Sequence, residues 1–178
     1  MQLIALIRPA AASPTIVRLT SGEKAKSSAH RISRGMRRLS CQLEGALADA
    51  VAEGLPPALT YAGFSFGGGQ AQRLAQLRPG ARAALLFESC YPITGEWAFG
   101  PWPPGVPVQV HGMDRDPFFA EDGGDLDAAR ELVATVDEAE LFTYPGDQHL
   151  FADESLSSYD AEAAALLTER ILGFLARI

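Results

Sequence analysis

A serine framed by glycines, between a strand-like and a helix-like stretch, restricts the possible folds of this chain more than any other feature. Residues 58–62 are mostly apolar and lead directly into the run 63–67 (Gly-Phe-Ser-Phe-Gly), and residues 70–77 follow with the composition of a helix. A serine on such a turn is held at a strained backbone angle, and its hydroxyl projects at the carboxyl edge of a sheet. The glycines leave room where strand and helix converge. We therefore predict that Ser65 lies on a nucleophile elbow.

A glycine-rich turn that binds a phosphate is the main alternative for the same run. The glycines at 67–69 are not followed by the Lys and Ser/Thr of a P-loop, and they lack the spacing of a dinucleotide-binding fingerprint. The strand before the turn and the helix after it therefore favour the elbow.

Short β-prone runs alternate with helical stretches from residue 58 to the end of the chain. The expected strands are 58–62, 82–87, 106–111 and 141–144, and the expected helices are 70–77, 126–136 and 160–178. This alternation is typical of a parallel sheet with crossover helices. The predicted fold class is α/β, with a mostly parallel sheet flanked by helices.

The first 57 residues show a weaker pattern. The candidate elements there are strands at 3–7 and 15–19 and a helix at 41–53. Residues 20–40 lack apolar periodicity, and we expect them to be partly mobile. Because a chain of 178 residues can bury one substantial core, we expect a single domain. In it, residues 1–57 are a divergent N-terminal segment and residues 58–178 are the core that carries the catalytic residues.

The net charge of −7 conceals a basic leader. Residues 1–40 carry eight Lys or Arg against a single acid, so the remainder of the chain is strongly acidic. A basic, Ser-rich leader has the composition of a transit peptide, and a basic arm can also contact nucleic acid. The acidic remainder argues against a nucleic-acid-binding body, because phosphate contact needs clustered positive charge on the folded surface. We expect no nucleic-acid partner.

Neither membrane insertion nor export is indicated by the sequence. No apolar run approaches the roughly 18 residues needed to span a bilayer, and the start of the chain lacks a signal-peptide pattern. The two cysteines, Cys41 and Cys90, lack the spacing of a metal site or a redox motif. Two isolated thiols suit a reducing compartment. We expect a cytoplasmic protein that binds no membrane and no metal.

The base that would take the serine proton is expected to be one of three histidines. His149 is favoured, because it lies in a loop just after the last predicted strand, at the sheet edge where the elbow is also expected. His30 lies in the unpatterned basic segment. His111 ends a strand, where a histidine is more often a packed residue. A histidine exposed on a surface loop is the alternative for His149.

The acid that orients the histidine should lie between serine and histidine in the chain. Asp114 and Asp116 both qualify, since both follow the strand expected at 106–111. We favour Asp116, because Pro117 restricts its backbone to extended conformations, whereas Asp114 has Arg115 beside it for a solvated ion pair. The alternative is that both are acids of a loop surface.

Aromatic residues near these segments are candidates for an apolar acyl pocket. They are Trp97, Trp102, Phe118 and Phe119. Large aromatic side chains line many small-molecule sites, but they are equally common as anchors of a core. The sequence leaves both interpretations open.

The run from residue 62 to the end resembles the dienelactone hydrolase family. The resemblance is carried by the elbow at 63–69 and by the segments 111–119 and 144–151, which fall in the family's order and spacing. It implies a compact α/β-hydrolase fold without a cap domain, a triad of nucleophile, Asp and His, and no metal or organic cofactor. The expected substrate is a small-molecule ester or lactone, and we expect a monomer or homodimer.

Two features depart from the family pattern. The founding members carry cysteine at the elbow, so Ser65 shifts the expected substrate toward general esters. Only 64 residues precede Ser65, which indicates a shortened or divergent N-terminal segment. The backbone N–H of Phe66 is the expected oxyanion donor, and the turn around Arg8 and Pro9 is the candidate for the second donor.

Two functions therefore remain open. The first is a serine hydrolase that cleaves small carboxylic esters or lactones through an acyl-enzyme. The second is a catalytically weak or inactive relative that serves as a binding or assembly module, as the missing upstream elements would allow. Turnover that Ser65→Ala abolishes would separate the first from the second.

Overall fold

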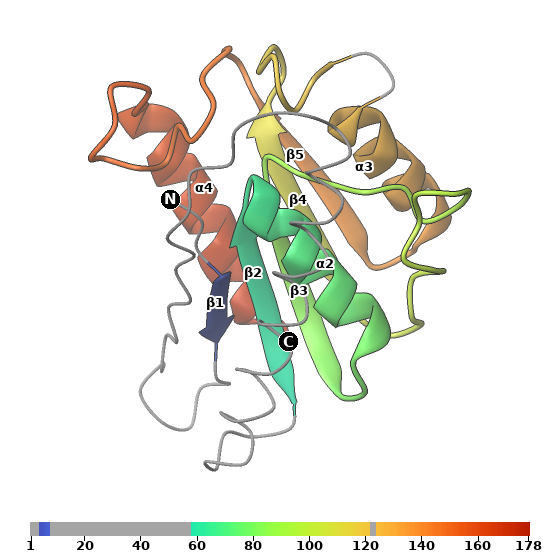
Figure 1. Ribbon diagram of the computed structural model, residues 1–178. Helices are drawn as coiled ribbons and strands as arrows, with labels where there is room; N and C mark the ends of the chain where they lie inside the picture. The colour runs from blue at the N-terminus through green and yellow to red at the C-terminus, as the bar shows by residue number, and fades with distance from the viewer. Residues whose placement is uncertain (1–3, 8–57, 122–123) are drawn as a thin grey trace.

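The computed structural model describes residues 4–7, 58–121 and 124–178, which form a five-stranded sheet with helices on both faces (Figure 1). The strands are β1 (Ile4–Ile7), β2 (Leu59–Phe64), β3 (Ala81–Phe87), β4 (Val108–Met113) and β5 (Ala139–Tyr144). They lie in sequential order, with β1 antiparallel to β2 and the other four strands parallel. The expected α/β class is confirmed.

The helices divide the apolar residues into two layers. They are α2 (Phe66–Leu77), α3 (Asp125–Thr135) and α4 (Ala161–Leu175). One cluster joins Leu74 of α2 and Leu132 of α3 to Tyr61 of β2. The other joins Phe174 of α4 to Leu85 of β3. Because successive strand residues point to opposite faces, the sheet is buried between α2 and α3 on one side and α4 on the other.

The four parallel strands end at one edge of the sheet, and the loops that follow carry the polar residues of interest. Ser65 follows β2, Glu88 follows β3, Asp116 follows β4 and His149 follows β5. In open α/β sheets this carboxyl edge is where sites are built. The topology therefore collects four segments that are far apart in sequence.

The predicted elements exist, with shifted ends. α2 begins at Phe66 instead of residue 70, and the glycines at 67–69 are buried in its first turn. β4 begins at Val108 instead of 106, after Pro107, which has no N–H to donate to a ladder. The strand expected at 3–7 is β1. The strand expected at 15–19, the helix at 41–53 and the mobile stretch at 20–40 lie outside the described residues.

Within the described residues, no helix has the length and apolar character needed to cross a membrane.

Candidate active site

Ser65 occupies a sharp turn between β2 and α2. It is the N-cap of α2, with φ 50° and ψ −124°, and its N–H donates to the Phe87 carbonyl at 2.7 Å. A left-handed φ is uncommon for a serine and is maintained only where the surroundings enforce it. A Cβ at Gly63 would overlap the Gly67 backbone, so Gly63 can be no larger. The local geometry is that of the expected elbow.

The imidazole of His149 connects this serine to an acid. Its Nε2 lies 2.8 Å from Ser65 Oγ, and its Nδ1 lies 2.6 Å from Asp116 Oδ2. Since Asp116 accepts at Nδ1, the ring carries its proton there and presents an unprotonated Nε2 to the serine hydroxyl. This arrangement can take the serine proton and return it to a leaving group.

Asp116, and not Asp114, is the carboxylate that the structure brings to His149. The Asp116 side chain is fully buried, and its second oxygen accepts the Phe118 N–H at 2.9 Å. Asp114 instead accepts the Gly146 N–H at 3.0 Å, and it lies 4.0 Å from the exposed Arg115. The half-exposed Asp114 thus fastens the loop after β4 to the loop after β5.

Opposing influences set the basicity of His149. Burial by itself would lower the pKa of the imidazole, but the hydrogen bond to Asp116 and the charges of Glu88, Asp116 and Asp125 raise it above 6.5. A raised pKa makes Nε2 a stronger base and stabilises the imidazolium that forms when the serine proton is transferred. The acidic surroundings therefore suit a general base.

Glu88 is the residue near the imidazole that the sequence did not single out. It follows β3 directly, it is buried, and its Oε2 lies 3.7 Å from His149 Nδ1. Its position after a parallel strand was a usable signal, because that is the sheet edge where the other polar residues gather. Ser65, Glu88 and Leu150 are the described non-glycine residues with left-handed φ, and all three lie at or beside His149. Backbone strain in the described chain is thus concentrated at this site.

A backbone N–H at the start of α2 can donate to a developing oxyanion. Phe66 is the first residue of that helix, and the N–H of a first helical residue has no partner within its own helix. The partial positive charge of the helix terminus adds to this donor. The second candidate donor, near Arg8 and Pro9, lies outside the described residues.

The four aromatic candidates for an acyl pocket fall into two groups. Trp102 and Phe119 are buried in the core cluster under α2 and α3, and Trp102 Nε1 donates to the Val106 carbonyl at 2.7 Å. For these two the interpretation as core anchors fits. Trp97 and Phe118 are exposed, and the Phe118 ring lies 4.9 Å from the His149 ring, centroid to centroid. Of the four, Phe118 is thus the aromatic placed to contact a group bound beside Ser65 and His149.

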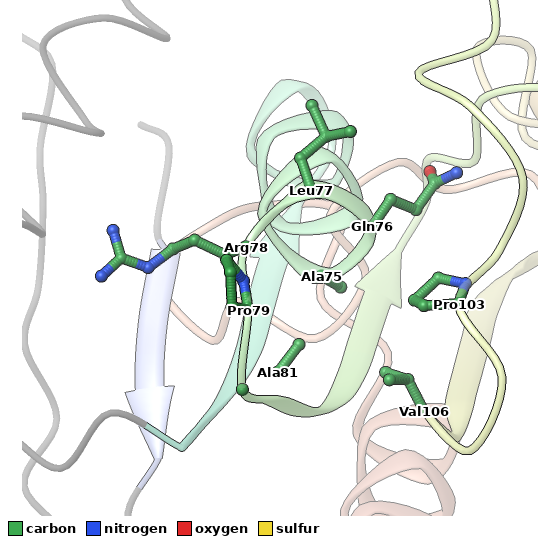
Figure 2. A pocket seen from close by; sticks show the side chains of 9 residues that line it. Ala75, Gln76, Leu77, Arg78, Pro79, Ala81, Pro103 and Val106 are labelled. Atoms are coloured by element: carbon green, nitrogen blue, oxygen red, sulfur yellow. The ribbon is translucent and has the colours of Figure 1, made fainter.

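A cavity of about 280 Å³ lies at the opposite end of the sheet (Figure 2). Its lining comes from the end of α2, the start of β3 and the loop before β4, including Gln76, Ala81 and Val106. Figure 2 shows the Arg78 side chain extending away from Pro103 and Val106. Because Ala81 begins β3 and the serine turn lies beyond the strand ends, this cavity does not contain the Ser65 and His149 side chains.

Among the described residues, Glu88, Asp116 and His149 also form a cluster with metal-ligand chemistry, with one ligand atom from each within 4.8 Å of the others. His149 Nδ1 faces both carboxylates, 2.6 Å from Asp116 Oδ2 and 3.7 Å from Glu88 Oε2. A cation there would replace the Nδ1 proton. The short contact to Asp116 therefore favours the arrangement as a proton relay.

His111 lies away from the serine and belongs to a separate polar network. Its Nδ1 is 3.0 Å from the Tyr144 hydroxyl, and its Nε2 is 3.1 Å from Gln109 Oε1. Gln109 in turn donates its amide to Glu140 at 2.6 Å. Since Gln109 Oε1 can only accept, the neutral tautomer has its proton on Nε2 and accepts from Tyr144 at Nδ1. His111 is a packed residue, as the sequence favoured.

The same network predicts that stability falls in acid. Burial lowers the pKa of His111 to about 3, whereas an unfolded histidine titrates near 6.5. Between those values the unfolded state binds one more proton than the folded state. The free energy of unfolding therefore decreases as the pH is lowered, by up to about 1.4 kcal/mol per pH unit. His111→Gln removes this titration and is expected to flatten the slope. Urea unfolding from neutral pH downward measures it, and equal slopes for both proteins would contradict a neutral buried imidazole.

Comparison with known proteins adds a family to this geometry. The family described as "Dienelactone hydrolase family" matches residues 21–178. A crystal structure of a candidate dienelactone hydrolase from Klebsiella pneumoniae superposes with a TM-score of 0.61 at 21% identity, over 80% of this chain and 62% of that one. At such identity the likeness shows the fold, and the chain spans 62% of that relative's length. No curated protein matches the chain.

Proposed function

The chain belongs to the dienelactone hydrolase family, and from this premise we propose that it is a serine hydrolase that cleaves small carboxylic esters or lactones. The observation that carries the proposal is the continuous relay of 2.8 Å from Ser65 to His149 and 2.6 Å from His149 to Asp116. Nucleophile, base and orienting acid are all within hydrogen-bond reach. Family membership supports hydrolysis, and the relay supports the acyl-enzyme route.

The first half of the reaction forms the acyl-enzyme. Ser65 Oγ attacks the carbonyl carbon while its proton moves to His149 Nε2, and the carbonyl electron pair moves onto the oxygen. The Phe66 N–H donates to that oxyanion. The intermediate collapses, the C–O bond to the leaving group breaks, and His149 returns the proton to the departing alkoxide. Asp116 remains a carboxylate and stabilises the imidazolium throughout.

The second half releases the acid. Water loses a proton to His149 Nε2 as its oxygen attacks the acyl carbon, and the second intermediate expels Ser65, which recovers the proton. With a lactone the alkoxide stays tethered to the acyl group after the first step, so one product, a hydroxy acid, leaves the site.

The serine shapes the expected substrate range. The sequence resembles a family whose founding members use a cysteine thiolate, whereas Ser65 must lose its proton during attack. Serine therefore depends fully on His149, and we propose short esters and small lactones as substrates. Phe118, exposed beside the His149 ring, offers an apolar contact for the acyl or alcohol part.

A fluorophosphonate probe tests the proposal without knowledge of the natural substrate. The probe phosphorus is expected to bond to Ser65 Oγ with loss of fluoride, and peptide mass spectrometry should find the label on that residue. His149→Gln is expected to slow labelling by about 10⁴-fold or more, because the hydroxyl loses its base. An unlabelled Ser65 with His149 intact would refute the serine hydrolase and favour the binding module.

A further inference from the structure

Glu88 is fixed between three segments of the sheet edge. Its N–H donates to the His111 carbonyl at 2.6 Å, and its Oε1 accepts the Phe151 N–H at 3.2 Å. The residue has φ 55°, a conformation that a glutamate adopts only under constraint. The residue thus joins the end of β3 to β4 through its backbone, and to the loop that carries His149 through its side chain.

The other carboxyl oxygen of Glu88 is directed at the imidazole. Oε2 is buried, has no hydrogen-bond partner among the described residues, and lies 3.7 Å from His149 Nδ1. A buried carboxyl oxygen without a donor is costly, and that cost is normally offset by a nearby positive charge. His149 supplies this charge only when it is protonated. The orphaned oxygen is therefore best compensated in the state that forms after the serine proton is transferred.

We propose that Glu88 is a second acid for His149, a positioning residue that holds the loop after the imidazole and shares with Asp116 the charge of the imidazolium. This role rests on the proposed serine hydrolase mechanism. Two carboxyl groups then stabilise one base. Asp116 does so through a direct hydrogen bond to the imidazole, and Glu88 through its charge and its hydrogen bond with the Phe151 N–H.

Three acidic side chains face the imidazole of His149. The imidazole faces Asp116 from the loop after β4, Glu88 from the end of β3 and Asp125 from the start of α3. Burial raises the pKa of Glu88 to about 7, and the positive charge of His149 opposes that rise. The carboxyl group and the imidazole lie 3.7 Å apart, so the charge of each depends on the charge of the other and the two titrations are coupled.

Nuclear magnetic resonance of the histidine side chains provides the main test. In Glu88→Gln the apparent pKa of His149 is expected to fall by about one unit, since a charge within 4–6 Å is removed. Asp147→Asn is the matched control, because it removes an equal charge two residues from His149 on an exposed side chain. The His149 signal is assigned with His149→Gln. Equal shifts in Glu88→Gln and Asp147→Asn would overturn the proposal.

A double-mutant cycle gives an independent kinetic reading. Glu88→Gln is expected to move the acid limb of kcat/KM for a p-nitrophenyl ester to lower pH, in parallel with the His149 titration. Asp116→Ala is expected to cost about tenfold more in the Glu88→Gln background than in the wild type, because the remaining acid is then lost. Identical costs in both backgrounds, with an unmoved acid limb, would leave Glu88 a structural residue and contradict the proposal.

The two tests separate this inference from the mechanism on which it rests. The His149 titration needs no substrate and no turnover. If wild type fails to react with fluorophosphonate but Glu88→Gln still lowers the His149 pKa, the hydrolase mechanism fails and the Glu88 coupling stands. If labelling succeeds and the titration does not move, the coupling fails and the mechanism stands.

Discussion

Replacing Ser65 with alanine is expected to lower the turnover of short p-nitrophenyl esters by about 10⁶-fold, leaving only the residual acceleration that substrate binding and the oxyanion donor provide. The change deletes the Oγ that lies 2.8 Å from His149 Nε2, so no acyl-enzyme can form. The fold should persist, since the Ser65 side chain accepts no capping hydrogen bond from the backbone of α2. Steady-state kinetics and circular dichroism measure the two quantities on the same sample.

Two further substitutions make this result specific. Ser157→Ala removes an exposed hydroxyl far along the chain and should leave the rate unchanged. Ser65→Cys keeps a nucleophile at the elbow and is expected to transfer reactivity from fluorophosphonates to thiol reagents such as iodoacetamide. If Ser65→Ala retained more than about one per cent of the rate, the reaction would run through another group, and the triad assignment would be wrong.

The carboxyl edge of the sheet could be predicted from sequence because its signals are local. The glycines on either side of Ser65 indicate its turn, and the strands that precede Asp116 and His149 are short β-prone runs followed by polar loops. Parallel strands bring their carboxyl ends to one edge, so chain order alone placed serine, acid and histidine together. Their proximity could therefore be predicted without knowledge of any long-range contact.

The choice between Asp114 and Asp116 depended on less certain reasoning. The two acids lie two residues apart in one loop, and the sequence cannot state which side chain turns inward. The structure distinguishes the two acids by their contacts with residues that are distant in the sequence. Asp114 accepts from Gly146 across the next loop, and Asp116 accepts from Phe118 while facing His149. Pro117 was a usable hint for Asp116, since it restricts the preceding backbone.

Glu88 and the aromatic residues show what sequence patterns leave out. The contact of Glu88 with His149 depends on the register of β3 against β4 and on the path of the loop after β5, which are tertiary features. Likewise Phe118 and Phe119 are adjacent and chemically identical, yet one is exposed and the other is buried against Gly112. Sequence periodicity predicts burial in helices and strands, but a loop has no such periodicity, so the burial of a single aromatic residue there cannot be predicted from it.

Gly63→Ala is the substitution expected to damage both fold and activity most among those that keep the triad side chains intact. A Cβ at this position would lie 2.7 Å from Gly68 N and closer still to the Gly67 carbonyl group. These are backbone atoms, so β2 or α2 must move. The expected loss in the free energy of unfolding is about 3 kcal/mol or more. Chemical denaturation measures it.

The activity of Gly63→Ala should fall further than its stability alone explains. Ser65 lies between the two elements that the methyl group would force apart, and a displacement of about 1 Å at a reacting group can cost about 100-fold in rate. The folded fraction of this variant is therefore expected to label with fluorophosphonate more slowly than wild type. Labelling measured well below the denaturation midpoint separates the two effects.

Gly173→Ala provides the matched control, because the same methyl group is added where the structure has room for it. Gly173 lies in α4 with nothing within 4 Å of the position that a Cβ would take, and alanine is favoured over glycine inside a helix by about 1 kcal/mol. The same added methyl group should thus destabilise the protein at Gly63 and stabilise it at Gly173, and labelling of Ser65 should be impaired only in Gly63→Ala. If Gly63→Ala were as stable and reactive as Gly173→Ala, the close approach of β2 to α2 would not be what sets the geometry of the nucleophile.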